Sequence, residues 1–354
     1  MTELLQRSLE IILENQTPSG AYVAGPSFPT YQYCWFRDGS FTAYAMDLFG
    51  RPDSAERFHD WAAAMINARA DVVQRAVARA RRGEALTEGD FLHTRYAPDG
   101  SEARADGWPN FQLDGFGTWL WALGEHQRLD GRSLPAAWSQ AAELVADYLT
   151  ALWSRPCYDC WEEFPDRVHT YTLAAIYGGL QADERVRRVD HRADLEQMTQ
   201  VLRSRAVNDG HFVKFVGSME VDANLLGLAT PFGFVEPDDP LLLATVRRIE
   251  DDLQQDGGLH RYRADSYYGG GEWILLTAWL GWHAAQIGER DKAEAALRWI
   301  EAQADADGQL PEQVPLHLND PAHYAPWRER WGGIARPLLW SHAKYLILHQ
   351  AVRG

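Results

Sequence analysis

The strongest constraint on the fold of this chain is a succession of helix-period segments that alternate in character. Hydrophobic residues recur every three to four positions through most of the 354 residues, and alternating strand patterns are scarce. Segments 190–205, 240–256 and 290–304 each carry a charged face, whereas 272–287 and 338–350 are apolar almost all round. A helix with one apolar stripe lies at a surface, and one that is apolar all round is buried. The chain therefore alternates outer helices with inner ones.

The pattern predicts twelve helices, six outer and six inner. Their expected ranges are 3–15, 39–49, 54–82, 114–128, 134–153, 167–183, 190–205, 222–230, 240–256, 272–287, 290–304 and 338–350. This alternation predicts an all-α fold, an (α/α)6 toroid in which six inner helices lie within six outer ones. A helical solenoid would show a repeat of fixed period, and the sequence shows none. We expect one domain over residues 1–354.

Charge and composition narrow the classes of partner. The net charge of −16 argues against nucleic acid or an anionic membrane surface and suits a neutral small molecule. No stretch approaches the length of a transmembrane span, and the first residues lack the features of a signal peptide. Three cysteines do not make a disulfide framework. We expect a cytoplasmic protein, a monomer or a homodimer, without nucleic-acid or membrane partners.

No residue pattern calls for a metal or a cofactor. Cys157 and Cys160 have the spacing of a redox or zinc pair, but no second pair stands elsewhere to complete a tetrahedral site. A structural thiol pair is the favoured interpretation. The sequence has neither an HExxH segment nor a GxSxG nucleophile elbow. We therefore expect no metal and no cofactor.

Five clusters of aromatic and polar residues fall on links that lead from an outer helix to an inner one. They are YCWFRD, GWPNFQLDG, CWEEFPDR, RYRADSYYGGGEW and LPEQ, which precede segments 39–49, 114–128, 167–183, 272–287 and 338–350. On a toroid these links share one rim, so we expect a single mouth. Flat rings beside charged side chains are typical of a sugar pocket. For Arg37 and Asp38 alone, a salt bridge at a helix start is the alternative.

Glutamates in two of these clusters are candidates for glycoside hydrolysis. Glu162 and Glu163 follow a tryptophan in DCWEEFPD, and Glu312 lies in GQLPEQ, about 150 residues on. Glycosidases need two carboxyl groups in distinct protonation states, one to protonate the leaving oxygen and one to activate water or attack the sugar. The alternative is an acidic helix start and an ordinary loop.

The remaining clusters supply candidate binding groups. Arg261, Asp265, Tyr267 and Tyr268 stand in RYRADSYYGGG, whose glycines permit close approach of the backbone. The segment lacks the Lys-Ser/Thr ending of a phosphate loop and follows no expected strand, so a sugar-binding loop is favoured.

The segment NFQLDG adds short polar groups two positions apart. Asn110, Gln112 and Asp114 point the same way if the segment is extended. The alternative for Asp114 is to cap the helix that begins there.

Taken in order, several of these motifs resemble one enzyme family. YCWFRDGSFTAYAMDLFG, CWEEF, VDANLLGLATPFGFVEPDDP, RYRADSYYGGGEW, LPEQ and WSHAKYL are similar to glycoside hydrolase family 15, which comprises glucoamylases, glucodextranases and bacterial α-glucosidases. The resemblance runs from about Tyr31 to Leu346. It implies an (α/α)6 toroid and an inverting reaction, with Glu162 as general acid and Glu312 as general base.

The resemblance also implies which residues bind the sugar. Arg37 and Asp38 would hold the outer hydroxyls of the terminal glucose. Further substrate contacts are expected from Tyr31, Trp35, Gln112, Asp114, Trp161, Glu163, Arg261, Asp265, Tyr267, Tyr268, Glu272 and Trp273. The sequence after the base, PEQVPLHLNDPAHYAPW, departs from the family pattern and leaves the linkage preference open.

These observations predict an inverting, exo-acting α-glucoside hydrolase. It would release β-D-glucose from the non-reducing ends of short isomalto- or malto-type oligosaccharides. A trehalase-type enzyme, a phosphorylase on the same toroid, a glycosidase for other sugars and a non-catalytic sugar sensor are the alternatives.

Overall fold

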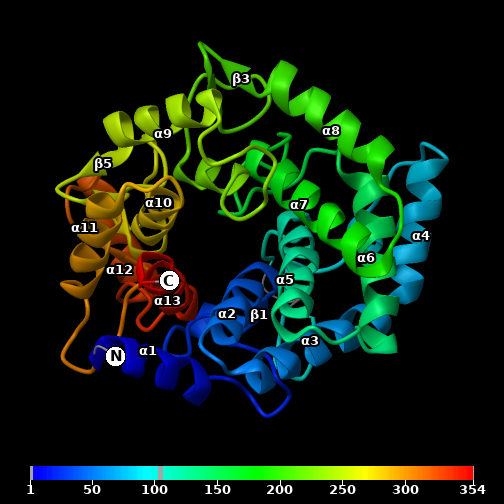
Figure 1. Ribbon diagram of the computed structural model, residues 1–354, viewed down its shortest axis with the longest axis horizontal. Helices are drawn as coiled ribbons and strands as arrows, with labels where there is room; N and C mark the ends of the chain where they lie inside the picture. Colours follow the sequence, from blue (N-terminus) through cyan, green and yellow to red (C-terminus); the bar gives the residue numbers. More distant parts are fainter. Residues whose placement is uncertain (1–2, 103–106, 354) are drawn as a thin grey trace.

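A closed ring of six inner helices forms the centre of the computed structural model, which describes residues 3–102 and 107–353. The inner elements are α2 (Phe36–Leu48), α5 (Asp114–Asp130), α7 (Thr170–Arg187), the 3-10 helix η4 (Ala223–Leu228), α10 (Ile274–Gln286) and α13 (Leu339–Arg353). Neighbours in this order are in contact, and α13 closes the ring against α2 (Figure 1). The predicted all-α toroid is confirmed.

An outer layer surrounds this ring. Its helices are α1 (Glu3–Glu14), α3 (Pro52–Asn67), α6 (Ala136–Leu152), α8 (Arg192–Arg205), α9 (Pro240–Leu253) and α11 (Arg290–Glu301). The two layers differ in burial as their sequences predict. Inner helix α10 buries every residue from Ile274 to Ala284, whereas outer helix α11 buries only one stripe, which includes Leu297 and Ile300. The burial of apolar surface in this way holds the layers together.

The prediction of a single helix over 54–82 is wrong. The chain forms two helices there, α3 and α4 (Ala70–Arg81), with a non-helical residue, Arg69, between them. The Arg69 guanidinium donates to Glu102 Oε1 at 2.7 Å and to the Gly100 carbonyl at 2.8 Å. These contacts with a distant loop bend the backbone, and the local hydrophobic period does not reveal them.

Two further elements differ from the expectation. In place of the helix predicted over 222–230, the chain forms the 3-10 helix η4. Asp222 caps the start of this helix, because its side chain accepts from Asn224 N at 2.9 Å. Pro231 follows and disfavours helical geometry in the residue before it. The short helix α12 (Tyr324–Trp331) was not predicted, because it buries no residue and so lacks an apolar period.

Short antiparallel strand pairs hold the starts of two inner helices. β1 (Cys34–Trp35) pairs with β2 (Arg95–Tyr96) and leads directly into α2. β7 (Glu272–Trp273) pairs with β8 (Gln313–Val314) and leads into α10. The second pair matters for the site because Glu312 immediately precedes β8.

The other short elements lie in the remaining links. They are the strand pairs β3 (Val207–Asn208) with β4 (His211–Phe212) and β5 (Gln254–Gln255) with β6 (Gly258–Leu259), and the 3-10 turns η1 (Pro29–Tyr31), η2 (Glu88–Asp90), η5 (Tyr267–Gly269) and η6 (Pro321–His323). Within the described ranges, no helix is long and apolar enough to cross a membrane.

Candidate active site

One cavity of about 310 Å³ opens among the links that precede the inner helices. This places the predicted clusters around a single mouth, as the toroid requires. The predicted site residues that line it are Tyr31, Trp35, Arg37, Asp38, Trp161, Glu162, Glu163, Arg261, Tyr267, Trp273 and Glu312. Both candidate catalytic carboxyl groups thus face the same space, amid aromatic rings.

Glu162 is held at one side of the cavity by two nitrogen donors. Trp35 Nε1 donates to Glu162 Oε1 at 2.6 Å, and Gln112 Nε2 donates to the same oxygen at 3.1 Å. Since both donors converge on Oε1, the other oxygen, Oε2, is the one able to carry a proton. The Glu162 backbone has φ of 68°, in the left-handed region that glycine favours. Such strain persists only where the surroundings enforce it.

A short turn built on Asp159 enforces that geometry. Asp159 Oδ1 accepts from the backbone N–H groups of Trp161 at 3.0 Å and Glu163 at 2.8 Å. The Asp159 carbonyl accepts from Glu162 N at 2.9 Å. The predicted acidic pair therefore lies in a turn and not at a helix start, and the strained residue is a candidate catalytic acid.

Glu312 occupies a drier part of the cavity. Its side chain is only 5% exposed, and Oε1 accepts from the Tyr31 hydroxyl at 3.1 Å. The Tyr31 oxygen is in turn 2.8 Å from the Tyr267 hydroxyl. Within the described part of the chain, Glu312 Oε2 has no hydrogen-bond partner. Burial raises the pKa of Glu312 to about 8, while the Tyr31 hydrogen bond and the charge of Arg261 act in the opposite direction.

Arg37 organises the floor of the cavity with three acceptors. It contacts Asp38 Oδ2 at 3.3 Å, Asp114 Oδ2 at 3.2 Å and Gln112 Oε1 at 3.3 Å. Burial raises the pKa of Asp38 to about 6, and the Arg37 charge opposes that rise. Gln112 and Asp114 do not line the cavity. They orient Arg37 and Glu162 from behind, and Asp114 does not cap its helix, because Leu113 holds that position.

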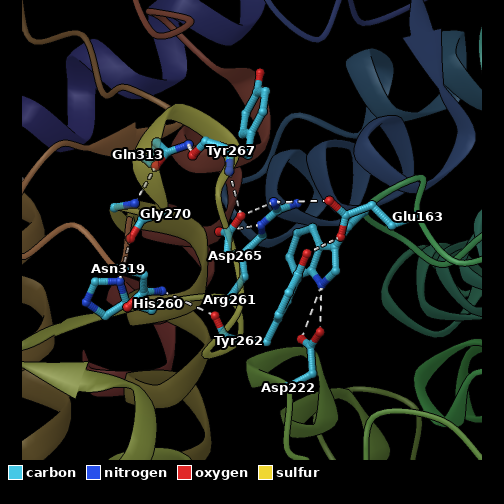
Figure 2. A network of polar contacts seen from close by, with 12 residues as sticks. Glu163, Asp222, His260, Arg261, Tyr262, Asp265, Tyr267, Gly270, Gln313 and Asn319 are labelled. Atoms are coloured by element: carbon cyan, nitrogen blue, oxygen red, sulfur yellow. Dashed lines mark hydrogen bonds and ion pairs between the residues drawn. The ribbon is translucent and has the colours of Figure 1, made fainter. Parts of the chain in front are cut away.

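Arg261 forms a second charged centre (Figure 2). Its Nε donates to Asp265 Oδ2 at 2.8 Å and its Nη2 to Asp265 Oδ1, a forked pairing that fixes the guanidinium plane. Nη2 also lies 3.5 Å from Glu163 Oε1, and the Tyr262 hydroxyl donates to Glu163 Oε2. Asp265 accepts from Tyr267 N at 2.9 Å and does not line the cavity. It positions Arg261 and the tyrosine loop.

Comparison of the sequence with known families shows which family the chain belongs to. The sequence profile described as glycosyl hydrolases family 15 matches residues 2–311. This chain belongs to glycosyl hydrolase family 15. The match spans most of the chain and ends one residue before Glu312. It confirms the resemblance, and the protein is a glycoside hydrolase.

Two relatives show how near this family 15 hydrolase lies to characterised activities. It is 45% identical to the isomaltose glucohydrolase of Kribbella flavida, over 98% of this chain and 91% of that protein. It is 26% identical to trehalase 1 of Sulfolobus acidocaldarius, over 75% of this chain and only 48% of the trehalase. The first relative shares nearly its whole length with this chain, and the second about half.

Solved structures agree with the fold of the family 15 hydrolase. A structure titled wild-type glycosidase matches with a TM-score of 0.95 and 43% identity, covering 99% of this chain and 96% of that one. A bacterial glucoamylase complexed with acarbose matches with a TM-score of 0.77 and 19% identity, covering 99% of this chain and 55% of that one. At that identity the glucoamylase supports the fold alone.

Besides Gln112, Asp114 and Asp265, two more predicted site residues of the family 15 hydrolase do not line the cavity. Tyr268 is fully buried and donates to the Gly332 carbonyl at 3.2 Å. Glu272 is also fully buried, and its Oε1 is 2.8 Å from His317 Nδ1. Adjacent residues of a strand point to opposite faces, so Trp273 lines the cavity while Glu272 does not. Both residues support the wall from behind.

Several aromatic residues of the cavity escaped the sequence prediction. Trp108 and Trp340 line it, and the Arg37 guanidinium carbon lies 5.0 Å from the centre of the Trp340 ring. Helix α12 contributes Trp327 and Trp331. The segment WRERW lies on the link before α13, so the rule that found the other clusters would have found it too.

Proposed function

We propose that this family 15 hydrolase is an inverting, exo-acting α-glucosidase whose preferred substrate is isomaltose or a short α-1,6-linked relative. The observation that carries the proposal is the placement of Glu162 and Glu312 on one aromatic-lined cavity. Its volume of about 310 Å³ is at the lower end of the range of about 300–1,000 Å³ that ligand pockets span, which suits one or two sugar rings. The 45% identical isomaltose glucohydrolase supports the linkage.

Glu162 is proposed as the general acid. The two N–H donors on Oε1 leave the proton on Oε2, where it would be delivered to the glycosidic oxygen as the bond breaks. Trp35 and Gln112 hold the side chain in place through this transfer. Arg37 and Asp38 would grip the hydroxyls of the terminal glucose.

Glu312 is proposed as the general base. To act, Glu312 must be ionised. Burial keeps its pKa at about 8, so the ionised fraction grows toward that pH, and the Tyr31 hydroxyl and the Arg261 charge both increase it. Its Oε2, which has no partner among the described residues, would take the proton of a water that attacks the anomeric carbon. Attack from the face opposite the leaving group gives β-glucose.

A trehalase-type activity is the second candidate. Six trehalases are among the relatives, but each is no more than 27% identical and about half or more of each lies outside the match. The isomaltose relative is nearer in both identity and length. We therefore propose that the enzyme cleaves the α-1,6 bond of isomaltose in preference to the α,α-1,1 bond of trehalose. Maltose is the third substrate to compare.

One experiment tests both linkage and stereochemistry. The purified protein is incubated with isomaltose, maltose and trehalose in parallel, and the first anomer of free glucose is followed by proton NMR. Early β-glucose, released fastest from isomaltose, supports the proposal. Early α-glucose would refute inversion. No release without phosphate, but release with it, would show a phosphorylase, and binding without turnover would show a sugar sensor.

The setting of the enzyme is also a proposal. All three cysteines are unpaired and buried, which suits a reducing compartment such as the cytoplasm. The expected state is a monomer or a homodimer, which sedimentation of the purified chain would distinguish.

A further inference from the structure

A buried cluster of two histidines and one aspartate lies outside the cavity. Asp47 is near the end of α2, His59 is in α3 and His126 is in α5. One ligand-type atom from each residue lies within 4.8 Å of the others. The three side chains are almost completely shielded from solvent, and none of them lines the cavity. The cluster therefore has no part in the proposed hydrolysis.

His59 is the unusual member of this cluster. It is fully buried, and neither ring nitrogen has a hydrogen-bond partner in the part of the chain that the structure describes. A neutral imidazole presents one donor and one acceptor, and leaving each unsatisfied in the interior costs about 1–3 kcal/mol.

The other two residues, Asp47 and His126, already hold their ligand-type atoms about as close together as two ligands of one metal ion. His126 Nδ1 lies 3.0 and 2.9 Å from the two carboxylate oxygens of Asp47. This spacing fits a hydrogen bond, and it is also near the separation of roughly 3.3 Å between donor atoms that share a tetrahedral ion at about 2.0–2.1 Å. A nitrogen of His59 lies within 4.8 Å of these atoms, so a third donor stands beside the pair.

The charge around the cluster favours a cation. The carboxylates of Glu56 and Asp130 are near enough to add their negative field to that of Asp47. Arg132 pairs with both Glu56 and Asp130 and partly offsets them. Three carboxylates thus surround two imidazoles, with one guanidinium at the exposed side.

From this geometry we propose that Asp47, His59 and His126 bind a divalent first-row transition ion, with zinc as the best fit. Two imidazole nitrogens and one carboxylate oxygen are donors that suit zinc and its neighbours, and they do not suit calcium or magnesium. Because the cluster is buried and remote from the cavity, the ion is structural. It ties the inner helices α2 and α5 to the outer helix α3.

The test begins with chelator-treated, full-length protein titrated with zinc chloride and followed by calorimetry and thermal unfolding. We expect one zinc ion per chain and a rise in melting temperature, since a ligand that binds only the folded state stabilises it. Cobalt substituted for zinc should give the intense d–d absorption of a four-coordinate site. Absence of stoichiometric binding would overturn the proposal.

Two variants make the test specific. His59→Phe keeps a ring against Trp138, whose centroid lies 5.2 Å away, but removes both nitrogens, so we expect zinc affinity to fall by more than about tenfold. A matched control is His349→Phe, since His349 is buried between the rings of Phe49 and Tyr345 without such a cluster. The control should bind zinc like the native chain.

Asp47→Asn provides an independent measurement if the His59 variant does not fold. The asparagine can still accept from His126 Nδ1, so the local hydrogen bond survives while the anionic ligand is lost. We expect loss of zinc binding and of the zinc-dependent rise in melting temperature. Unchanged zinc affinity in either folded variant would overturn the proposal. Failure of isomaltose hydrolysis would not affect this result, because the readouts are binding and stability.

Discussion

Replacing Glu312 by glutamine should stabilise the protein at neutral pH while it abolishes catalysis. Burial raises the pKa of this carboxyl group from 4.5 to about 8 in the folded state. Between these two values the unfolded chain has released the proton and the folded chain has kept it. The unfolded state therefore binds fewer protons, and the free energy of unfolding falls as pH rises through this window. Glutamine stays neutral at every pH and escapes this loss.

The size of the effect follows from the same two values. At about pH 7 the difference from the unfolded-state pKa of 4.5 is roughly 2.5 pH units, and each unit corresponds to about 1.36 kcal/mol. The free energy of unfolding of Glu312→Gln should therefore exceed that of the native chain by roughly 3 kcal/mol. At about pH 5 the gain should be below about 1 kcal/mol by the same reasoning.

Urea unfolding of both chains at these two pH values measures the difference. The control is Glu329→Gln on α12, which removes an exposed carboxyl group and should leave the pH dependence of stability unchanged. A gain for Glu312→Gln that is the same at both pH values would refute the reasoning, because it could not then come from the proton.

Three further predictions concern the proposed chemistry. Glu162→Gln should remove activity on isomaltose yet spare glucosyl fluoride, whose leaving group needs no proton; equal loss on both, measured by initial rates, would contradict the acid assignment. Tyr31→Phe removes a hydrogen bond that favours ionised Glu312, so the acid limb of kcat/KM should move to higher pH, and an unmoved limb would count against the base assignment. Asp265→Asn weakens the forked pairing that fixes the buried Arg261, so KM for isomaltose should rise several-fold and the melting temperature should fall; an unaltered KM would show that Arg261 is held by its other contacts.

The architecture could be predicted because it is encoded in local hydrophobicity. An inner helix such as 272–287 is apolar on every side, and the structure has α10 there as Ile274–Gln286. Once inner and outer helices were distinguished, the links between them had to meet at one rim. That is why the sequence predicts that Glu162 and Glu312, 150 positions apart, lie on one cavity, as the structure has them.

The errors arose where distant contacts decide the local geometry. The break at Arg69 depends on hydrogen bonds to Glu102 and to the Gly100 carbonyl, which no local pattern announces. Tyr267 and Tyr268 are neighbours of the same type, yet only Tyr267 lines the cavity. The Tyr268 backbone has φ of 48°, a conformation that sequence gives no reason to expect for tyrosine.

The assembly of the mouth from separate links bears on how such enzymes diversify. Each link connects one outer helix to one inner helix, and the packing of the inner helices into a closed ring holds the fold together. The segment that contains α12 forms one wall of the cavity with Trp327 and Trp331 and supplies neither catalytic carboxyl group. Grafting a different loop in place of that segment would reshape one wall of the pocket without removing Glu162 or Glu312. Exchange of the α12 segment is therefore a route by which evolution or protein engineering can change the substrate preference.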